Sequence, residues 1–80
     1  MQVGCGVYEL TIRRNSYIYF WHYETKDRVR RQVKEYLGPA GSPEARAEGI
    51  RRCEAYYARM HEELRKLRET TLASIAARRW

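Results

Sequence analysis

This chain of 80 residues lacks the features that mark several common protein classes. Two cysteines, Cys5 and Cys53, are too few for the disulfide framework of a small secreted domain. No apolar run approaches the roughly 20 residues of a membrane-spanning helix, and no signal-peptide pattern follows Met1. We therefore expect a cytoplasmic protein with no membrane contact.

Motifs for catalysis and metal binding are also missing. The sequence has no phosphate-binding glycine loop and no nucleophile elbow. Cys5, His22, Cys53 and His61 follow one another at separations of 17, 31 and 8 residues, without the paired short spacings of zinc sites. We expect no enzyme activity, no cofactor and no metal.

Lysine is scarce, and arginine supplies most of the positive charge. The chain has 16 basic residues, of which three are lysines, against ten acidic ones, and its net charge is +6. The planar guanidinium group binds phosphates and guanine edges through paired hydrogen bonds. This composition favours a polyanionic partner, although arginines that merely solvate helix faces would give the same numbers.

The N-terminal half has the pattern of a small β-sheet. Residues 3–14 alternate, with Tyr8, Leu10 and Ile12 on one side, and residues 17–23 are rich in aromatic and β-branched side chains. Asn15-Ser16 predicts the turn between these strands, and Glu24 to Asp27 predicts the next connection. Residues 28–37 fit either a helix or a strand. We predict a third strand there, because a lone two-stranded hairpin is marginal in water.

The C-terminal half predicts one long helix. Gly38 to Gly41 form a linker, Ser42 is the expected N-cap, and Pro43 suits the first helical position. The helix is expected over residues 42–79, with possible breaks near Gly49 or Thr70 left open. The fold class is therefore α+β: a single domain over 1–80, with a three-stranded antiparallel β segment at 3–37, the linker at 38–41 and a coiled-coil-like amphipathic helix.

The apolar residues of this helix follow a heptad repeat. They form a seam that predicts a homodimer, because the helix is too long for a short sheet to cover. The predicted dimer interface consists of Ile50, Cys53, Tyr57, Met60, Leu64 and Leu67. With Ile50 as heptad position a, Glu63 at g and Arg68 at e would attract in a parallel dimer. One such pair leaves the orientation open.

The second strand has two apolar faces, and one helix covers only one of them. We expect the face with Ile18 and Phe20 to be the core and the tyrosine and tryptophan face to be exposed; the reverse assignment is the alternative. Exposed rings beside guanidinium groups are typical of nucleic-acid-binding surfaces. The predicted nucleic-acid-binding residues are Arg13, Arg14, Tyr17, Tyr19, Trp21, Arg28, Arg30 and Arg31.

The run from Tyr17 to Pro39, YIYFWHYETKDRVRRQVKEYLGP, resembles an N-terminal module of archaeal and bacterial mobile-element proteins. In tyrosine-recombinase integrases and transposases of this kind, an aromatic strand, a turn and a basic strand end in Tyr-Leu-Gly-Pro. Here Glu24 to Asp27 replace the usual glycine turn, and we expect no recombinase domain. The resemblance implies a β-rich accessory module that docks on DNA.

Together these observations predict a small, basic, non-catalytic nucleic-acid-binding protein that dimerises through its C-terminal helix. Duplex DNA is favoured over RNA as the ligand, and base specificity is left open. The alternative is a coiled-coil protein-interaction adaptor with no nucleic-acid role.

Overall fold

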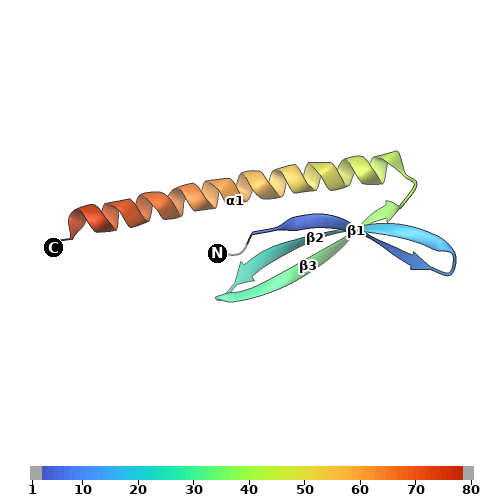
Figure 1. The fold of residues 1–80 in the computed structure, drawn as a ribbon, viewed down its shortest axis with the longest axis horizontal. Helices are drawn as coiled ribbons and strands as arrows, with labels where there is room; N and C mark the ends of the chain where they lie inside the picture. The colour runs from blue at the N-terminus through green and yellow to red at the C-terminus, as the bar shows by residue number, and fades with distance from the viewer. Residues whose placement is uncertain (1–2, 79–80) are drawn as a thin grey trace.

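The fold is an α+β arrangement of one antiparallel sheet and one long helix, as predicted. The computed structural model describes residues 3–78 (Figure 1). Three strands, β1 (Cys5–Ile12), β2 (Asn15–Lys26) and β3 (Val29–Pro39), form a sheet in the order β1-β2-β3, and α1 (Pro43–Ala77) follows. The ambiguous segment at 28–37 is a strand, so the helical alternative for it is wrong.

The first hairpin turn precedes its predicted position, and the second overlaps the predicted connection only at Asp27. Ile12 pairs with Asn15 and Lys26 pairs with Val29, so each connection has two central residues, Arg13-Arg14 and Asp27-Arg28. The predicted turn residues Asn15 and Ser16 belong to β2, as do Glu24 to Lys26. Cross-strand pairing of large side chains outweighs local turn preference here, because it aligns Tyr8 with Tyr19.

The helix begins as predicted and runs without a break. The Ser42 hydroxyl accepts a hydrogen bond from the backbone N–H of Ala45 at 3.2 Å, and Pro43 and Glu44 occupy the first turn. Helical structure continues through Gly49 and Thr70 to Ala77. Arg78 is the C-cap rather than a helical residue, and Arg79, the last residue of the predicted helix, lies outside the described residues.

The core lies between α1 and the face of β2 that carries Phe20, as predicted. Phe20, Tyr56 and Met60 form the buried cluster, and Cys5, Leu37 and Cys53 pack against it. The alternative, with the tyrosine face as core, is wrong. Gly49 allows the helix to approach the sheet closely, since a Cβ there would lie 3.1 Å from both Leu37 and Val7.

Met60 and Tyr56 both lie on the side of the helix that packs against the sheet. Met60 was expected at a dimer interface, but that prediction is wrong, because the side chain is buried against its own sheet. Cys53 is half-buried beside the same cluster. Tyr56, which lies outside the heptad seam, is 4% exposed and fills the centre of the core. The remaining seam residues are exposed: Ile50, Tyr57, Leu64 and Leu67.

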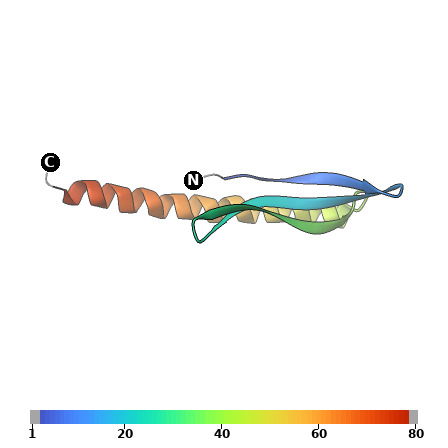
Figure 2. The same cartoon turned by 90° about the horizontal axis from the view of Figure 1, so that it is seen from below.

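The helix extends well beyond the sheet, which makes the molecule elongated, 64 × 23 × 14 Å (Figure 1). In the view from the sheet side, α1 lies behind β2 and β3, and β1 lies to one side of the helix (Figure 2). From Met60 to Ala77 the helix has about 26 Å of length at 1.5 Å per residue, and its leucines and Ile75 are exposed. Within residues 3–78, no helix combines the length and apolar character needed to cross a membrane.

Candidate nucleic-acid interface

Six aromatic side chains gather on the face of the sheet that points away from α1. Side chains alternate along a strand, so the odd-numbered residues of β2 share this face with their cross-strand neighbours in β1 and β3. We call this surface the ring face; its rings are Tyr8, Tyr17, Tyr19, Trp21, Tyr23 and Tyr36. All except Tyr36 are half-buried, and Tyr36 is 54% exposed.

Two glycines in the N-terminal segment make room for the largest rings. A Cβ at Gly6 would lie 2.8 Å from the indole nitrogen of Trp21, and one at Gly4 would lie 3.5 Å from the ring of Tyr23. The rings therefore lie across the edge of the sheet over bare backbone. A side chain at Gly6 would displace the indole.

The rings of this face contact one another in two groups, one of four tyrosines and one of Trp21 and Tyr23. Tyr8 and Tyr19 stack with centroids 5.3 Å apart and planes 15° apart, and Tyr19 meets Tyr36 edge-on at 5.5 Å. Trp21 meets Tyr23 in the same edge-on manner at 5.5 Å. These pairs hold the rings in fixed orientations.

The charge on the ring face has one sign. Arg30 lies over the Tyr23 ring at 5.7 Å, and Lys34 lies over the Tyr8 ring at 5.8 Å. Among the described residues of the three strands, every aspartate or glutamate has a position on the opposite face of the sheet. An anion approaching the ring face therefore meets cations and aromatic rings without a competing carboxylate.

Arginines also occupy both hairpin turns, where they adopt an uncommon backbone conformation. Arg13 and Arg14 have φ of 50° and 72°, and Asp27 and Arg28 have φ of 54° and 65°. Two-residue turns with both φ positive strongly prefer Asn-Gly, because other residues pay a steric cost in the left-handed region. A strained backbone that is retained in an arginine-bearing turn indicates a functional role for the arginine side chains.

Four arginines of α1 form ion pairs with glutamates of the helix or of the sheet. Arginines at 51, 52, 59 and 65 pair with Glu24, Glu35, Glu48, Glu62 or Glu69. The sheet arginines are different. Within residues 3–78, no ion pair involves any of Arg13, Arg14, Arg28, Arg30 and Arg31, and all five are exposed.

The predicted binding residues are brought together with one exception. Tyr17, Tyr19, Trp21 and Arg30 share the ring face, and the turn arginines flank it. Arg31 pairs across from Glu24 and so lies on the helix side of the sheet, which contradicts its assignment to the same surface. The predicted set of binding residues did not include four members of the face: Tyr8, Tyr23, Lys34 and Tyr36. Period-two alternation in β3 would have selected Lys34 and Tyr36 and rejected Arg31.

On the other face, a charged cluster fastens the helix to the sheet. His22 is buried in the central strand; its Nε2 is 3.0 Å from Glu35, and its Nδ1 lies 2.9 Å from Glu24 without the alignment of a hydrogen bond. Arg52 of α1 binds Glu35 at 2.8 Å, and Arg59 pairs with Glu24, whose carboxylate raises the pKa of Arg59. We interpret this cluster as structural, since each carboxylate bridges the two elements.

The cysteines and histidines do not form a metal site. Cys5 and Cys53 come together beside Tyr57, and burial together with the Cys5 thiol raises the pKa of Cys53 to about 11. His22 is held by glutamates, and His61 is exposed on the helix. In the described part of the chain, no three histidine, cysteine, aspartate or glutamate side chains are placed to hold a metal ion.

The geometry of the ring face is thus the basis for any functional assignment. The resemblance of residues 17–39 to a mobile-element module stays a prediction. Comparison of the chain with protein-family models, with curated proteins and with solved structures finds no match in any of the three.

Proposed function

We propose that this protein is a non-catalytic, cytoplasmic nucleic-acid-binding module that docks its ring face on duplex DNA and self-associates through α1. The observation that carries the proposal is the sheet face without carboxylates, with cations among its rings and unpaired arginines in the turns at both ends. Guanidinium groups without acidic partners have no ion pair to give up when they bind phosphate.

The length of the sheet supports a duplex as the ligand. The twelve residues of β2 separate the two arginine-bearing turns by about 36 Å at 3.3 Å per residue. One turn of B-form DNA rises by about 34–36 Å, so phosphates that flank one groove recur on the same side of the helix with a similar period. The turn arginines are therefore spaced to contact two backbone segments while the ring face lies over the groove between them.

The mutual packing of the rings favours a duplex over a single strand. Single-strand binding uses aromatic faces that are free to stack on unpaired bases. Here Tyr8 and Tyr19 already stack on each other, and Lys34 lies over the Tyr8 ring. Rings in this arrangement offer an apolar surface to sugars and base edges, with arginines beside them for phosphates.

Fluorescence anisotropy with a labelled 20-base-pair duplex at a series of salt concentrations tests the proposal. The logarithm of the association constant should fall linearly with the logarithm of salt concentration, with a slope of about −0.9 for each phosphate contact. Single-stranded DNA of the same length should compete less well than duplex. A binding constant that does not change with salt, or no binding at low salt, contradicts the proposal and leaves the protein-interaction adaptor.

Two adjacent arginines provide a matched pair of variants. Arg30 lies on the ring face and Arg31 on the opposite side of β3, and both are exposed. Arg30→Gln should weaken duplex binding and reduce the magnitude of the salt slope by about one if Arg30 contacts a phosphate. Arg31→Gln removes the same charge and should change affinity much less. Equal losses in the two variants would show that net charge, rather than the ring face, governs binding.

A further inference from the structure

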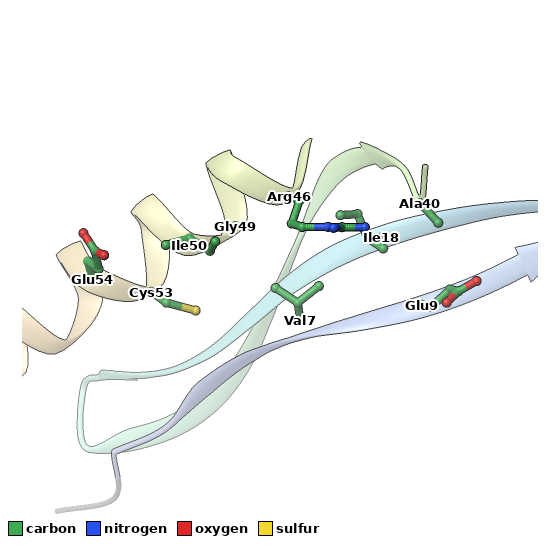
Figure 3. Close-up of a pocket in the computed structure, with 9 residues that line it drawn as sticks. All are labelled: Val7, Glu9, Ile18, Ala40, Arg46, Gly49, Ile50, Cys53 and Glu54. Atoms are coloured by element: carbon green, nitrogen blue, oxygen red, sulfur yellow. The ribbon is translucent and has the colours of Figure 1, made fainter. Parts of the chain in front are cut away.

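The side of α1 next to β1 carries an apolar groove with a charged rim. Figure 3 shows the groove with helical residues on one side and strand residues on the other. Cys53 of the helix and Val7 of β1 face the space between the two elements. The groove has a volume of about 500 Å³. It is lined by Val7, Glu9, Ile18, Ala40, Arg46, Gly49, Ile50, Cys53 and Glu54.

An apolar stripe continues from this groove along the part of α1 that has no sheet beneath it. Ile50, Tyr57, Leu64 and Ile75 follow one another at seven, seven and eleven residues, which keeps them on one side of an α-helix. Each is about half exposed or more. The same molecule thus presents two apolar surfaces. One is an uncovered ridge near the C-terminal end of the helix, formed by Leu64 and Ile75, and the other is the groove near the N-terminal end of the helix.

The position of the sheet decides which flank of the stripe is accessible. With Ile50 as heptad position a, Gly49 and Tyr56 fall at position g, and both are buried against the sheet. Position e holds Glu54, His61 and Arg68, all exposed. Parallel coiled-coil pairs place g of one helix beside e of the other. That contact is blocked along the covered part of α1, whereas an e-to-e contact, which two antiparallel helices make, is open.

The open flank is complementary to itself in the antiparallel orientation. With His61 at the centre, Glu54 of one copy lies opposite Arg68 of the other, twice by symmetry. Neither residue forms an ion pair within residues 3–78. The same alignment sets Ile50 opposite Leu72 and Tyr57 close to Leu64, and it brings Ile75 to the end of the groove next to Arg46.

We infer that two copies of this chain pair as antiparallel helices, with the C-terminal ridge of each copy seated in the groove between α1 and β1 of the other. The inference rests on the self-association in the proposed function and does not depend on nucleic-acid binding. Each copy supplies both the ridge and the groove, so the contact closes as a two-fold dimer without leaving either surface free.

Charge reversal tests the pairing, with sedimentation equilibrium as the measurement of the dimer dissociation constant. Glu54→Arg and Arg68→Glu should each raise that constant about 5- to 30-fold, because each variant converts two attractive contacts into repulsive ones. The double variant should return to within about threefold of the unmodified chain. Lys66→Glu makes the same change of charge as Arg68→Glu at heptad position c, away from the stripe, and should leave the constant nearly unchanged.

The distance between two spin labels tests the orientation. A single nitroxide at an Ala76→Cys substitution, in a chain with Cys5→Ala and Cys53→Ala, should report about 45 Å between the two copies of an antiparallel dimer. Adjacent parallel helices would bring the labels to roughly 10–15 Å. A short distance, or a double charge variant as weak as the sum of its parts, overturns the inference while self-association stands. A monomer at every concentration overturns both.

Discussion

At the level of single residues, the neighbouring tyrosines 56 and 57 have opposite surroundings. The Tyr56 hydroxyl donates a hydrogen bond to the carbonyl oxygen of Tyr23 at 3.0 Å and accepts one from the backbone N–H of Gly4 at 3.2 Å. It therefore links the helix to β2 and to the segment that precedes β1. Tyr57 is 51% exposed on the uncovered stripe.

We predict that Tyr56→Phe lowers the free energy of unfolding by about 1–3 kcal/mol, because two backbone groups lose their partner in a partly buried site. Tyr57→Phe removes the same hydroxyl from an exposed ring and should change it by less than about 0.5 kcal/mol. Urea denaturation of the two variants measures the difference. Similar values for both would mean that the Tyr56 hydroxyl does not couple the two elements.

Cys53 gives a prediction about pH. Its pKa is raised from 9.0 to about 11, first by burial and then by the hydrogen bond and charge of Cys5, so the folded protein holds it as the thiol at neutral pH. Since the folded pKa exceeds the unfolded one, this residue contributes stability below pH 9 that is lost as the pH rises towards 11.

In a Cys5→Ala variant burial still raises the pKa of Cys53, so alkylation by iodoacetamide near pH 9 should be slower in the folded chain than in the urea-unfolded chain. Mass spectrometry of timed samples measures both rates. A folded chain that reacts as fast as the unfolded one near pH 9 would contradict the burial of this thiol.

At the level of secondary-structure elements, the two hairpin turns combine strain with charge. Replacing Arg13-Arg14 by Asn-Gly supplies the residues that this turn type prefers. We expect the free energy of unfolding to rise by about 1–2 kcal/mol while duplex affinity falls, because two unpaired guanidinium groups are lost. Denaturation and anisotropy on the same sample measure the two effects.

Asp27→Gly is the control for this turn substitution. It relieves a positive φ in the opposite turn without removing an arginine, so it should raise stability without lowering duplex affinity. Loss of affinity in this variant as well would show that turn conformation, rather than arginine charge, affects binding.

The elements could be predicted from the sequence, but their boundaries and partners only in part. Three strands and a helix follow from alternation, from the heptad pattern and from the Ser42-Pro43 start. The turns were misplaced because Asn15-Ser16 has turn composition and Arg13-Arg14 does not. Strand pairing over eight residues fixed the register instead.

The sides of the helix were harder to predict, because one helix carries two apolar surfaces that share residues. Cys53 and Met60 belong to the heptad pattern and also pack on the sheet, while Tyr56 lies outside the pattern and occupies the core. A heptad read from sequence identifies an apolar side but not which neighbour covers it. That assignment needs the crossing position of helix and sheet, which depends on the close approach at Gly49.

At the level of the whole molecule, the core is small for the chain. Within residues 3–78, the buried side chains are four hydrophobic ones and His22, and none is below 2% exposed. A chain of this size gains limited stability from its own core, so surface covered by a second copy adds a substantial share.

We therefore predict that the thermal unfolding midpoint rises with protein concentration, because dimerisation stabilises the folded state by mass action. Circular dichroism melts over a hundredfold range of concentration measure the shift, and the Arg68→Glu variant should show a smaller one. A midpoint that is independent of concentration would indicate that the 35-residue helix is stable without a partner.

The length by which α1 exceeds the sheet would act as a molecular ruler in the antiparallel pair. The sheet covers the N-terminal half of the helix, so its centre lies near Cys53, eight residues from the two-fold axis at His61. At 1.5 Å per residue, the two ring faces would stand about 25 Å apart along the rod. Lengthening the helix by one heptad between sheet and axis would add about 21 Å to that distance. The spacing of the two contacts on DNA would thus be set by a count of residues.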